Sequence, residues 1–164
     1  MKIHTMSRGH HVSTAYGSVT WMGLMVFFLT ACTSTPPRYP EDHARFERIV
    51  EAVETLRRAY EQRDEAAIHD LALPLQEVEQ LEQEIARDFS TFSTITLTWA
   101  IDRITIKGDL IFVAIHWDGI WNRPAAKQPI HEAGHGILIW SGTQVILWAG
   151  VEGDVPFGIA DRLS

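Results

Sequence analysis

Cysteine is almost absent from this sequence. Cys32 is the only cysteine among 164 residues, so the chain cannot form an internal disulfide. Acidic side chains are also absent from one region, because none of the 21 precedes Cys32 and only Lys2 and Arg8 carry a fixed charge there. A domain that follows Cys32 must therefore be stabilised by its hydrophobic core without covalent cross-links.

Basic side chains are scarce in the rest of the chain. From Cys32 onward there are 12 basic and 21 acidic residues, a net charge of −9 with histidine neutral. Such a surface repels phosphate backbones and suits anionic membranes poorly, which argues against nucleic acid as a partner. Residues 41–90 hold 14 of the acids, which alternate with apolar positions as they do on solvated helix faces.

No hydrophobic run near the N-terminus is long enough for an ordinary membrane-spanning helix. Val19 to Ala31 has the length of the apolar region of a secretory signal, whereas a spanning helix needs about 20 residues. The run ends in Leu29-Thr30-Ala31-Cys32, which resembles the lipobox of bacterial lipoproteins. The resemblance implies a signal peptide over residues 1–31 and lipidation of Cys32. An uncleaved membrane anchor is the alternative.

The residues after Cys32 predict a short tether and a cellular location. Thr33, in place of an aspartate, favours the outer membrane in this lipoprotein class, so we expect an exported envelope protein that faces the periplasm of a Gram-negative cell. The segment TSTPPRYP, residues 33–40, has three prolines and predicts an extended tether. The 133 residues from Cys32 are enough for one domain, which we assign to residues 41–164.

The front of this domain has helical periodicity. From Glu41 to Arg63, apolar residues recur every three or four positions and predict one long helix. Asp64 can cap a short second helix that ends near Leu71, and Leu75 to Phe89 predicts a third.

After Ser90 the period changes to two, and β-branched and aromatic residues predict strands. Gly108-Asp109 and the segment 141–143 are typical of tight hairpins, so the sheet should be antiparallel. Leu110 to Ile115 is apolar at every position, which predicts helices on one face and sheet curvature or a second subunit on the other. The predicted strands are Thr94–Lys107, Leu110–Trp117, Gly136–Trp140 and Gln144–Val151.

One stretch, PIHEAGHGILIW, matches the H-E-x-x-H pattern of zinc peptidases through His131, Glu132 and His135. On a helix both histidines can reach one ion, but on a strand they lie about 13 Å apart along the chain. Gly134 and Gly136 disfavour a helix, so we expect a loop that turns at the glycines and runs into a strand. We therefore disfavour the interpretation of this stretch as the zinc site of a peptidase. A cross-strand metal site that pairs His116 with one of these histidines is a weaker variant, less favoured than polar surface or hydrogen-bonded core.

The whole domain resembles the nuclear transport factor 2-like (cystatin-like) superfamily. The resemblance rests on AYEQRDEAAIHDLALP at the first helix junction, on Lys107-Gly108-Asp109 at a hairpin, on the apolar strand ending in Trp117, and on the tail from Gly153 to Gly158. It implies an α+β fold in which three N-terminal helices pack on a curved antiparallel sheet around a cone-shaped pocket. Dimerisation through the sheet is frequent in this superfamily.

The superfamily contains isomerases, dehydratases and polyketide cyclases as well as catalytically silent binding modules, so the fold does not choose among them. Its steroid isomerases use a tyrosine on the first helix and an aspartate on an early strand. Tyr60 lies on the matching helix at a different distance from the junction, and no equivalent aspartate follows the second helix. No catalytic residue is therefore carried over.

Tryptophan is concentrated in the strand half of the domain. Trp99, His116, Trp117 and Trp121 are candidate liners of an apolar pocket, although tryptophans on strands more commonly belong to a core or a dimer interface. No acid–base pair can be assembled from the sequence. We therefore predict a non-catalytic module, without a cofactor, that binds a small molecule or protein. The alternative is a cofactor-independent pocket enzyme with His116 or an aspartate as general base.

Overall fold

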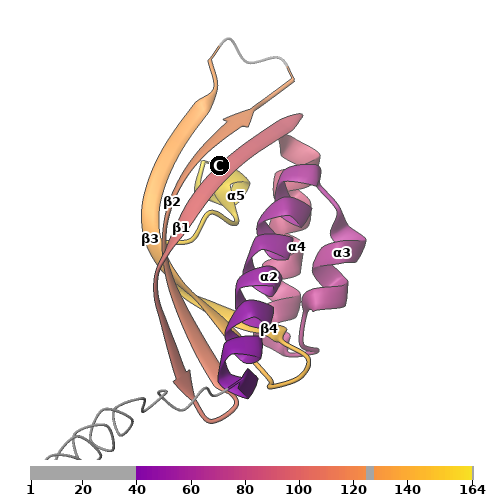
Figure 1. Ribbon diagram of the computed structural model, residues 1–164. Helices are drawn as coiled ribbons and strands as arrows, with labels where there is room; N and C mark the ends of the chain where they lie inside the picture. The colour runs from indigo at the N-terminus through magenta and orange to yellow at the C-terminus, as the bar shows by residue number, and fades with distance from the viewer. Residues whose placement is uncertain (1–39, 125–127, 164) are drawn as a thin grey trace, which may run out of the picture. The chain divides into compact units, whose positions relative to one another are not determined.

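Three helices precede a four-stranded sheet and pack on one of its faces (Figure 1). The computed structural model describes residues 40–124 and 128–163. All neighbouring strands are antiparallel, in the order β1-β2-β3-β4, and a short helix ends the described chain. The elements are α2 (Pro40–Gln62), α3 (Glu65–Leu71), α4 (Gln76–Thr91), β1 (Thr94–Lys107), β2 (Leu110–Asn122), β3 (Ile130–Ser141), β4 (Leu147–Gly153) and α5 (Ile159–Arg162).

The helices begin and end near the positions that the sequence predicts. The Asp64 carboxylate accepts a hydrogen bond from the Ala67 N–H at 3.0 Å, which confirms the predicted cap of α3. Arg63, with a φ of 57°, ends α2 and turns the chain toward that cap. The predicted fold class, three N-terminal helices on a curved antiparallel sheet, is confirmed.

The middle strands are longer than predicted. β2 continues from Trp117 to Asn122, and β3 begins at Ile130, six residues before the predicted start at Gly136. The prediction of a loop around HEAGH is therefore wrong. This segment belongs to β3 and pairs with β2, beginning with the pair of Trp121 and Ile130. The last strand also differs from the prediction, since it runs from Leu147 to Gly153.

Gly134 and Gly136 allow close packing and do not form a turn. A Cβ at Gly134 would lie 2.2 Å from Asp154 Oδ2, and one at Gly136 would lie 2.5 Å from the Asp154 carbonyl oxygen. The chain after β4 therefore crosses β3 at a distance that only glycine allows. Both glycines lie on β3, and the C-terminal segment packs directly on them.

Alternation along β2 divides the sheet into two faces. Ile111, Val113 and Ile115 are buried on the face that the helices cover, whereas Phe112 and Ala114 keep partial exposure on the other. We call this second face the helix-free face, since none of the described helices covers it (Figure 1). The prediction that helices cover one face of the apolar segment is confirmed.

The helix side has a polar centre inside an apolar core. Asp88 of α4 has no exposed surface and accepts hydrogen bonds from the Tyr60 hydroxyl at 2.7 Å and from the N–H groups of Gly158 and Ala160 at 2.8 and 2.7 Å. The Trp121 indole N–H donates to the Tyr60 hydroxyl at 3.0 Å. Asp88 therefore holds the first turn of α5 against α4, on the helix side of the sheet.

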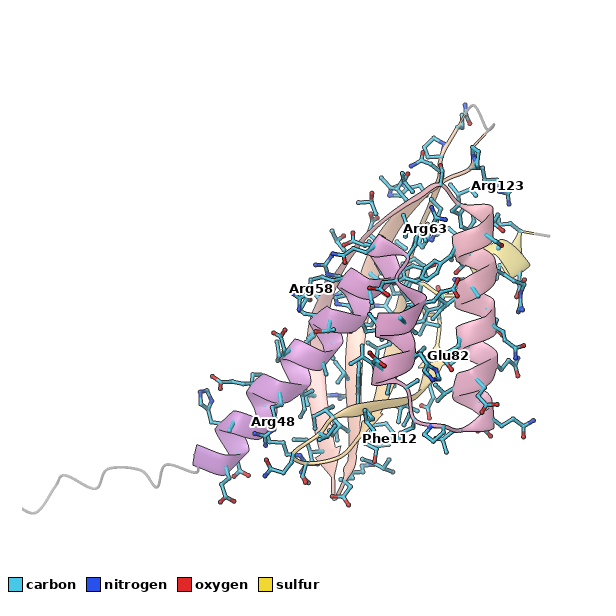
Figure 2. The ribbon with its side chains drawn as sticks, turned by 90° about the vertical axis from the view of Figure 1, so that its right-hand side faces the viewer. Arg48, Arg58, Arg63, Glu82, Phe112 and Arg123 are labelled. Carbon is cyan, nitrogen blue, oxygen red and sulfur yellow. The ribbon has the colours of Figure 1, made fainter. Side chains whose placement is uncertain are left out.

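Ion pairs hold the same C-terminal segment from outside. Arg87 of α4 binds both carboxylate oxygens of Asp161 at 2.6–2.9 Å, and this pairing holds the pKa of the Asp161 carboxyl below its ordinary value. Arg162 donates to Asp154 at 2.7 Å. The side chains of α2 and α4 that point away from the sheet are largely charged, as Figure 2 shows from the helix side.

The predicted signal peptide, the lipidated Cys32 and the tether lie outside the described residues. Within residues 40–124 and 128–163, no helix has both the length and the apolar character that crossing a bilayer requires.

The strand conformation of HEAGH predicts that it does not chelate zinc. His131 and His135 lie on the same face of β3 about 13 Å apart along the strand, too far for one ion to bind both nitrogens. We expect less than about 0.1 zinc per chain by elemental analysis after dialysis against trace zinc. Stoichiometric zinc that disappears in both His131→Ala and His135→Ala would contradict this prediction, because the strand cannot bring these two side chains to one ion.

A second prediction concerns the pH dependence of stability. Burial raises the pKa of Asp88, and the hydrogen bonds from Ala160, Tyr60 and Gly158 offset only part of that increase. The folded state therefore holds this proton more tightly than the unfolded state, whose aspartate titrates near about 3.9. The stabilisation is complete below that value and is lost as the pH rises through the raised pKa.

The variant Asp88→Asn removes this titration. Urea unfolding between about pH 4 and pH 7 should show that wild type gains free energy of unfolding relative to Asp88→Asn as the pH falls, by about 1.4 kcal/mol for each unit by which the pKa is raised. A relative loss of wild-type stability on acidification would mean that the hydrogen bonds outweigh burial and that the pKa is lowered.

Candidate functional site

Buried side chains fill the space between the helices and the sheet. Tyr60, Trp121, Trp140 and Trp148 have no exposed surface, and Phe157 packs edge-on against the Tyr60 ring at 5.1 Å between centroids. The cone-shaped pocket that the family resemblance implies is thus occupied by core residues and by the C-terminal segment at the centre of the helix side. Trp121, one of the candidate pocket liners, is part of this core.

The other three candidate liners border a hollow associated with the helix-free face. We call it the sheet hollow, and its volume is about 510 Å³. The side chains of Trp99 and Trp117 turn to the helix side, where their indole N–H groups donate to Glu54 and to the Asp154 carbonyl. His116 is exposed on the helix-free face. The hollow is lined by Thr98, Trp99, Ala100, His116, Trp117, Asp118, Ala133, Gly134 and His135.

Strand register brings the ionisable groups of the hollow together. His116 of β2 pairs directly with His135 of β3, and their rings lie 6.1 Å apart between centroids. A register shift in β1 between Ile101 and Arg103 leaves Asp102 beside His116, and its Oδ1 lies 2.7 Å from His116 Nδ1. On the same face, Asp118 lies 3.1 Å from His131 Nε2.

The arrangement gives His116 a defined orientation. A carboxylate at Nδ1 favours the tautomer with its proton there, which leaves Nε2 as an acceptor. In this form His116 can accept a hydrogen bond or a proton from a bound molecule. Its side chain is 53% exposed and that of Asp102 is 46% exposed, so water reaches both groups in the isolated chain.

The histidine triplet that the sequence offered as a weak metal site is only partly assembled. His116 and His135 are direct neighbours, but His131 lies farther along β3 and pairs with Asp118 instead. Among the residues that the structure describes, no group of three histidine, cysteine, aspartate or glutamate side chains is placed to hold a metal ion.

Apolar side chains continue the helix-free face beyond the hollow. Phe112 and Ala114 of β2 lie beside Ile139 and Ile137 of β3 in register, and all four are partly exposed. The face therefore combines an apolar half with a half that carries the histidine–carboxylate pairs. This combination of an apolar patch and polar groups is typical of a surface that binds another macromolecule.

The Asp102–His116 contact was missed by reasoning from sequence, which named His116 as a candidate pocket liner and possible general base and did not pair it with a carboxylate. Alternation puts Asp102 on the same face as Ala100, the strand partner of His116, but neither the pairing of β1 with β2 nor the register shift after Ile101 can be read from the sequence. No glycine or proline marks that position, so the sequence carries no signal for it.

No protein-family model matches this sequence, and a search of curated proteins found no match. Solved structures do match its fold. A nuclear transport factor 2 (NTF2-like) superfamily protein from Salmonella enterica matches with a TM-score of 0.61 and 16% identity, over 70% of this chain and 93% of its own. A conserved protein from Planctomyces limnophilus matches with a TM-score of 0.59 and 14% identity, over 68% and 95%.

An enzyme has the same architecture. A type 2 hexachlorocyclohexane dehydrochlorinase matches with a TM-score of 0.58 and 10% identity, over 73% of this chain and 90% of its own. At these identities the likeness establishes architecture and leaves activity open. The described part of the chain, residues 40–124 and 128–163, therefore has the nuclear transport factor 2-like fold.

Proposed function

We propose that this protein is a lipid-anchored module of the cell envelope that has no catalytic activity and binds a protein partner on its helix-free face. The first partner on this proposal is a second copy of the chain. Cys32 carries the lipid, and the tether after it keeps the domain near the membrane.

The observation that carries the proposal is the contrast between the two faces of the sheet. On the helix side, Tyr60, Asp88 and Trp121 bind one another and leave none of their hydrogen-bonding groups for a ligand in this closed arrangement. On the helix-free face, partly exposed apolar side chains lie in register beside exposed histidines. A binding function therefore has more available surface outside the cone than inside it.

Self-association fits the chemistry of this face. Two curved sheets related by a two-fold axis would present the same patch to each other, as isologous interfaces require. Phe112 and Ile139 would enter the interface centre, and the Asp102–His116 pair would supply hydrogen-bonding groups around it. Most acidic side chains of the domain lie on the helices, away from this face.

One observation favours a second candidate function, a cofactor-independent enzyme. The Asp102–His116 pair has the geometry of an oriented general base above small residues, Ala100 and Ala133, that leave room for a small molecule. A small molecule that raises the melting temperature of wild type, and whose effect is lost in His116→Gln but kept in His131→Gln, would indicate a ligand at this pair. Chemical conversion of that molecule by wild type and not by His116→Gln would favour the enzyme.

The dimer can be tested with the full-length protein in detergent. Phe112→Glu places an unpaired carboxylate in the proposed interface, so we expect the association constant to fall by at least about tenfold, measured by analytical ultracentrifugation. Gln83→Glu adds the same charge to the exposed side of α4 and should leave association unchanged. A wild-type protein that stays monomeric at about 100 μM, or equal association of both variants, would contradict the self-association proposal.

A further inference from the structure

Large exposed apolar side chains gather at one end of the domain. Val145 is 68% exposed, Phe46 48%, Leu110 45% and Ile106 43%. They come from the first turns of α2, from the β1–β2 hairpin and from the turn between β3 and β4, which lie together at the lower end of Figure 1. We call these four residues the apolar end. Isolated exposed apolar residues are ordinary, but these four lie on neighbouring segments at one end of the domain. Leu110 is on the helix-free side of the hairpin and Ile106 is on the helix side, so the residues surround the tip of the sheet and do not share one face.

Hydrogen bonds fix the three segments to one another. Arg45 of α2 donates from one nitrogen to the carbonyl oxygens of Gly108, in the hairpin, and Gly142, in the turn, at 2.8 Å each. Arg48 donates to the Thr143 carbonyl oxygen at 3.0 and 3.1 Å. Gly142 N–H in turn donates to the Asp109 carbonyl oxygen at 2.9 Å.

These bonds make the apolar end a preformed surface. Each arginine uses its guanidinium to connect α2 to the strand connections, so the backbones that carry Phe46, Leu110 and Val145 keep their spacing. Figure 2 places Arg48 and Phe112 toward this end and Arg123 at the opposite end. A surface that is already ordered loses little conformational entropy when it binds.

The chain enters the domain at this same end. α2 begins at Pro40, and eight residue steps separate Pro40 from Cys32. A fully extended chain spans at most about 3.6 Å per residue, so the start of α2 can lie no more than about 29 Å from Cys32. If Cys32 is lipidated, a condition that belongs to the proposed function, the apolar end is always within that reach of a bilayer.

We infer that the apolar end is a membrane-contact surface that inserts its side chains into the interface of the bilayer to which the lipid anchors the chain. Charge gives this contact no help, because Glu41, Asp42, Glu47 and Asp109 accompany Arg45, Arg48 and Lys107 on the same segments. The contact is apolar in origin and suits a zwitterionic lipid surface. Partition from water of a few partly exposed side chains is weak alone, but the anchor raises their effective concentration at the membrane.

Contact with lipid would orient the whole domain. The long strands β1 and β2 meet at the hairpin of the apolar end, so they would extend away from the membrane surface. The helix-free face would then be roughly perpendicular to the plane of the membrane. The sheet hollow, near the middle of these strands, would then stay open to the periplasm and to a partner. Membrane contact would use the tip of the sheet, and partner binding would use the helix-free face from Phe112 to His116. The two regions would meet at Leu110, which lies two residues from Phe112 on the same face.

The single cysteine of this chain makes the inference directly testable. Lipidation converts the Cys32 thiol into a thioether, so Val145→Cys and Leu110→Cys each supply the only free thiol for a nitroxide label. The lipidated protein, which begins at Cys32, is reconstituted in phosphatidylcholine vesicles, and the accessibility of the label to oxygen and to a water-soluble nickel chelate is measured. Oxygen collects in the bilayer and the chelate in water, so we expect their accessibility ratio to be at least about threefold higher at positions 145 and 110 than at Gln83→Cys, on exposed α4.

Two results would overturn the membrane contact. A ratio at position 145 equal to that at position 83 would mean that the apolar end stays in water, and protection from both reagents would mean that protein covers it instead. Mass spectrometry of residue 32 tests the anchor separately. If Cys32 carries no acyl chain, the anchor fails and the membrane contact that rests on it fails with it. An acylated Cys32 with equal ratios at positions 145 and 83 rejects the membrane contact alone.

Discussion

The hydrogen bonds to Asp88 are the interaction on which the rest of the structure depends. A carboxyl group without exposed surface is costly unless its oxygens have partners, and here they accept from Tyr60, Gly158 and Ala160. These partners lie on α2 and in the C-terminal segment, while Asp88 lies on α4. One side chain thus joins α2, α5 and, through Tyr60 and Trp121, the strand β2.

This arrangement decides where the domain can bind anything. Once Asp88 holds the start of α5 on the helix side, Phe157 packs against Tyr60 and against Trp148, and the centre of the cone is closed by aromatic rings. The glycines of β3 let the segment around Asp154 lie directly on the strand, which completes the closure. The uncovered surface of the sheet is then the helix-free face, where register has collected the exposed histidines.

Local sequence patterns predicted most of the fold, because helix caps and hydrophobic periods are local signals. Asp64 caps α3, and β1 has the bounds that its alternation indicated. The start of β3 was not predictable in this way, since His131 and Glu132 adopt a strand by pairing with β2 and not through their own preference. The Asp102–His116 pair and the Asp88 centre depend on contacts between distant segments, and neither has a local sequence signature.

HEAGH shows how backbone conformation decides what the same residues can do. On β3 the pattern separates two histidines that a helix would bring to one metal ion, and it gives each a different neighbour. His135 meets His116 across the strands in the sheet hollow, whereas His131 meets Asp118. Glu132 points to the opposite face and lies 3.8 Å from Arg162, beside the C-terminal segment. The five residues therefore contribute to both faces of the sheet, and their role follows from strand register instead of from the motif.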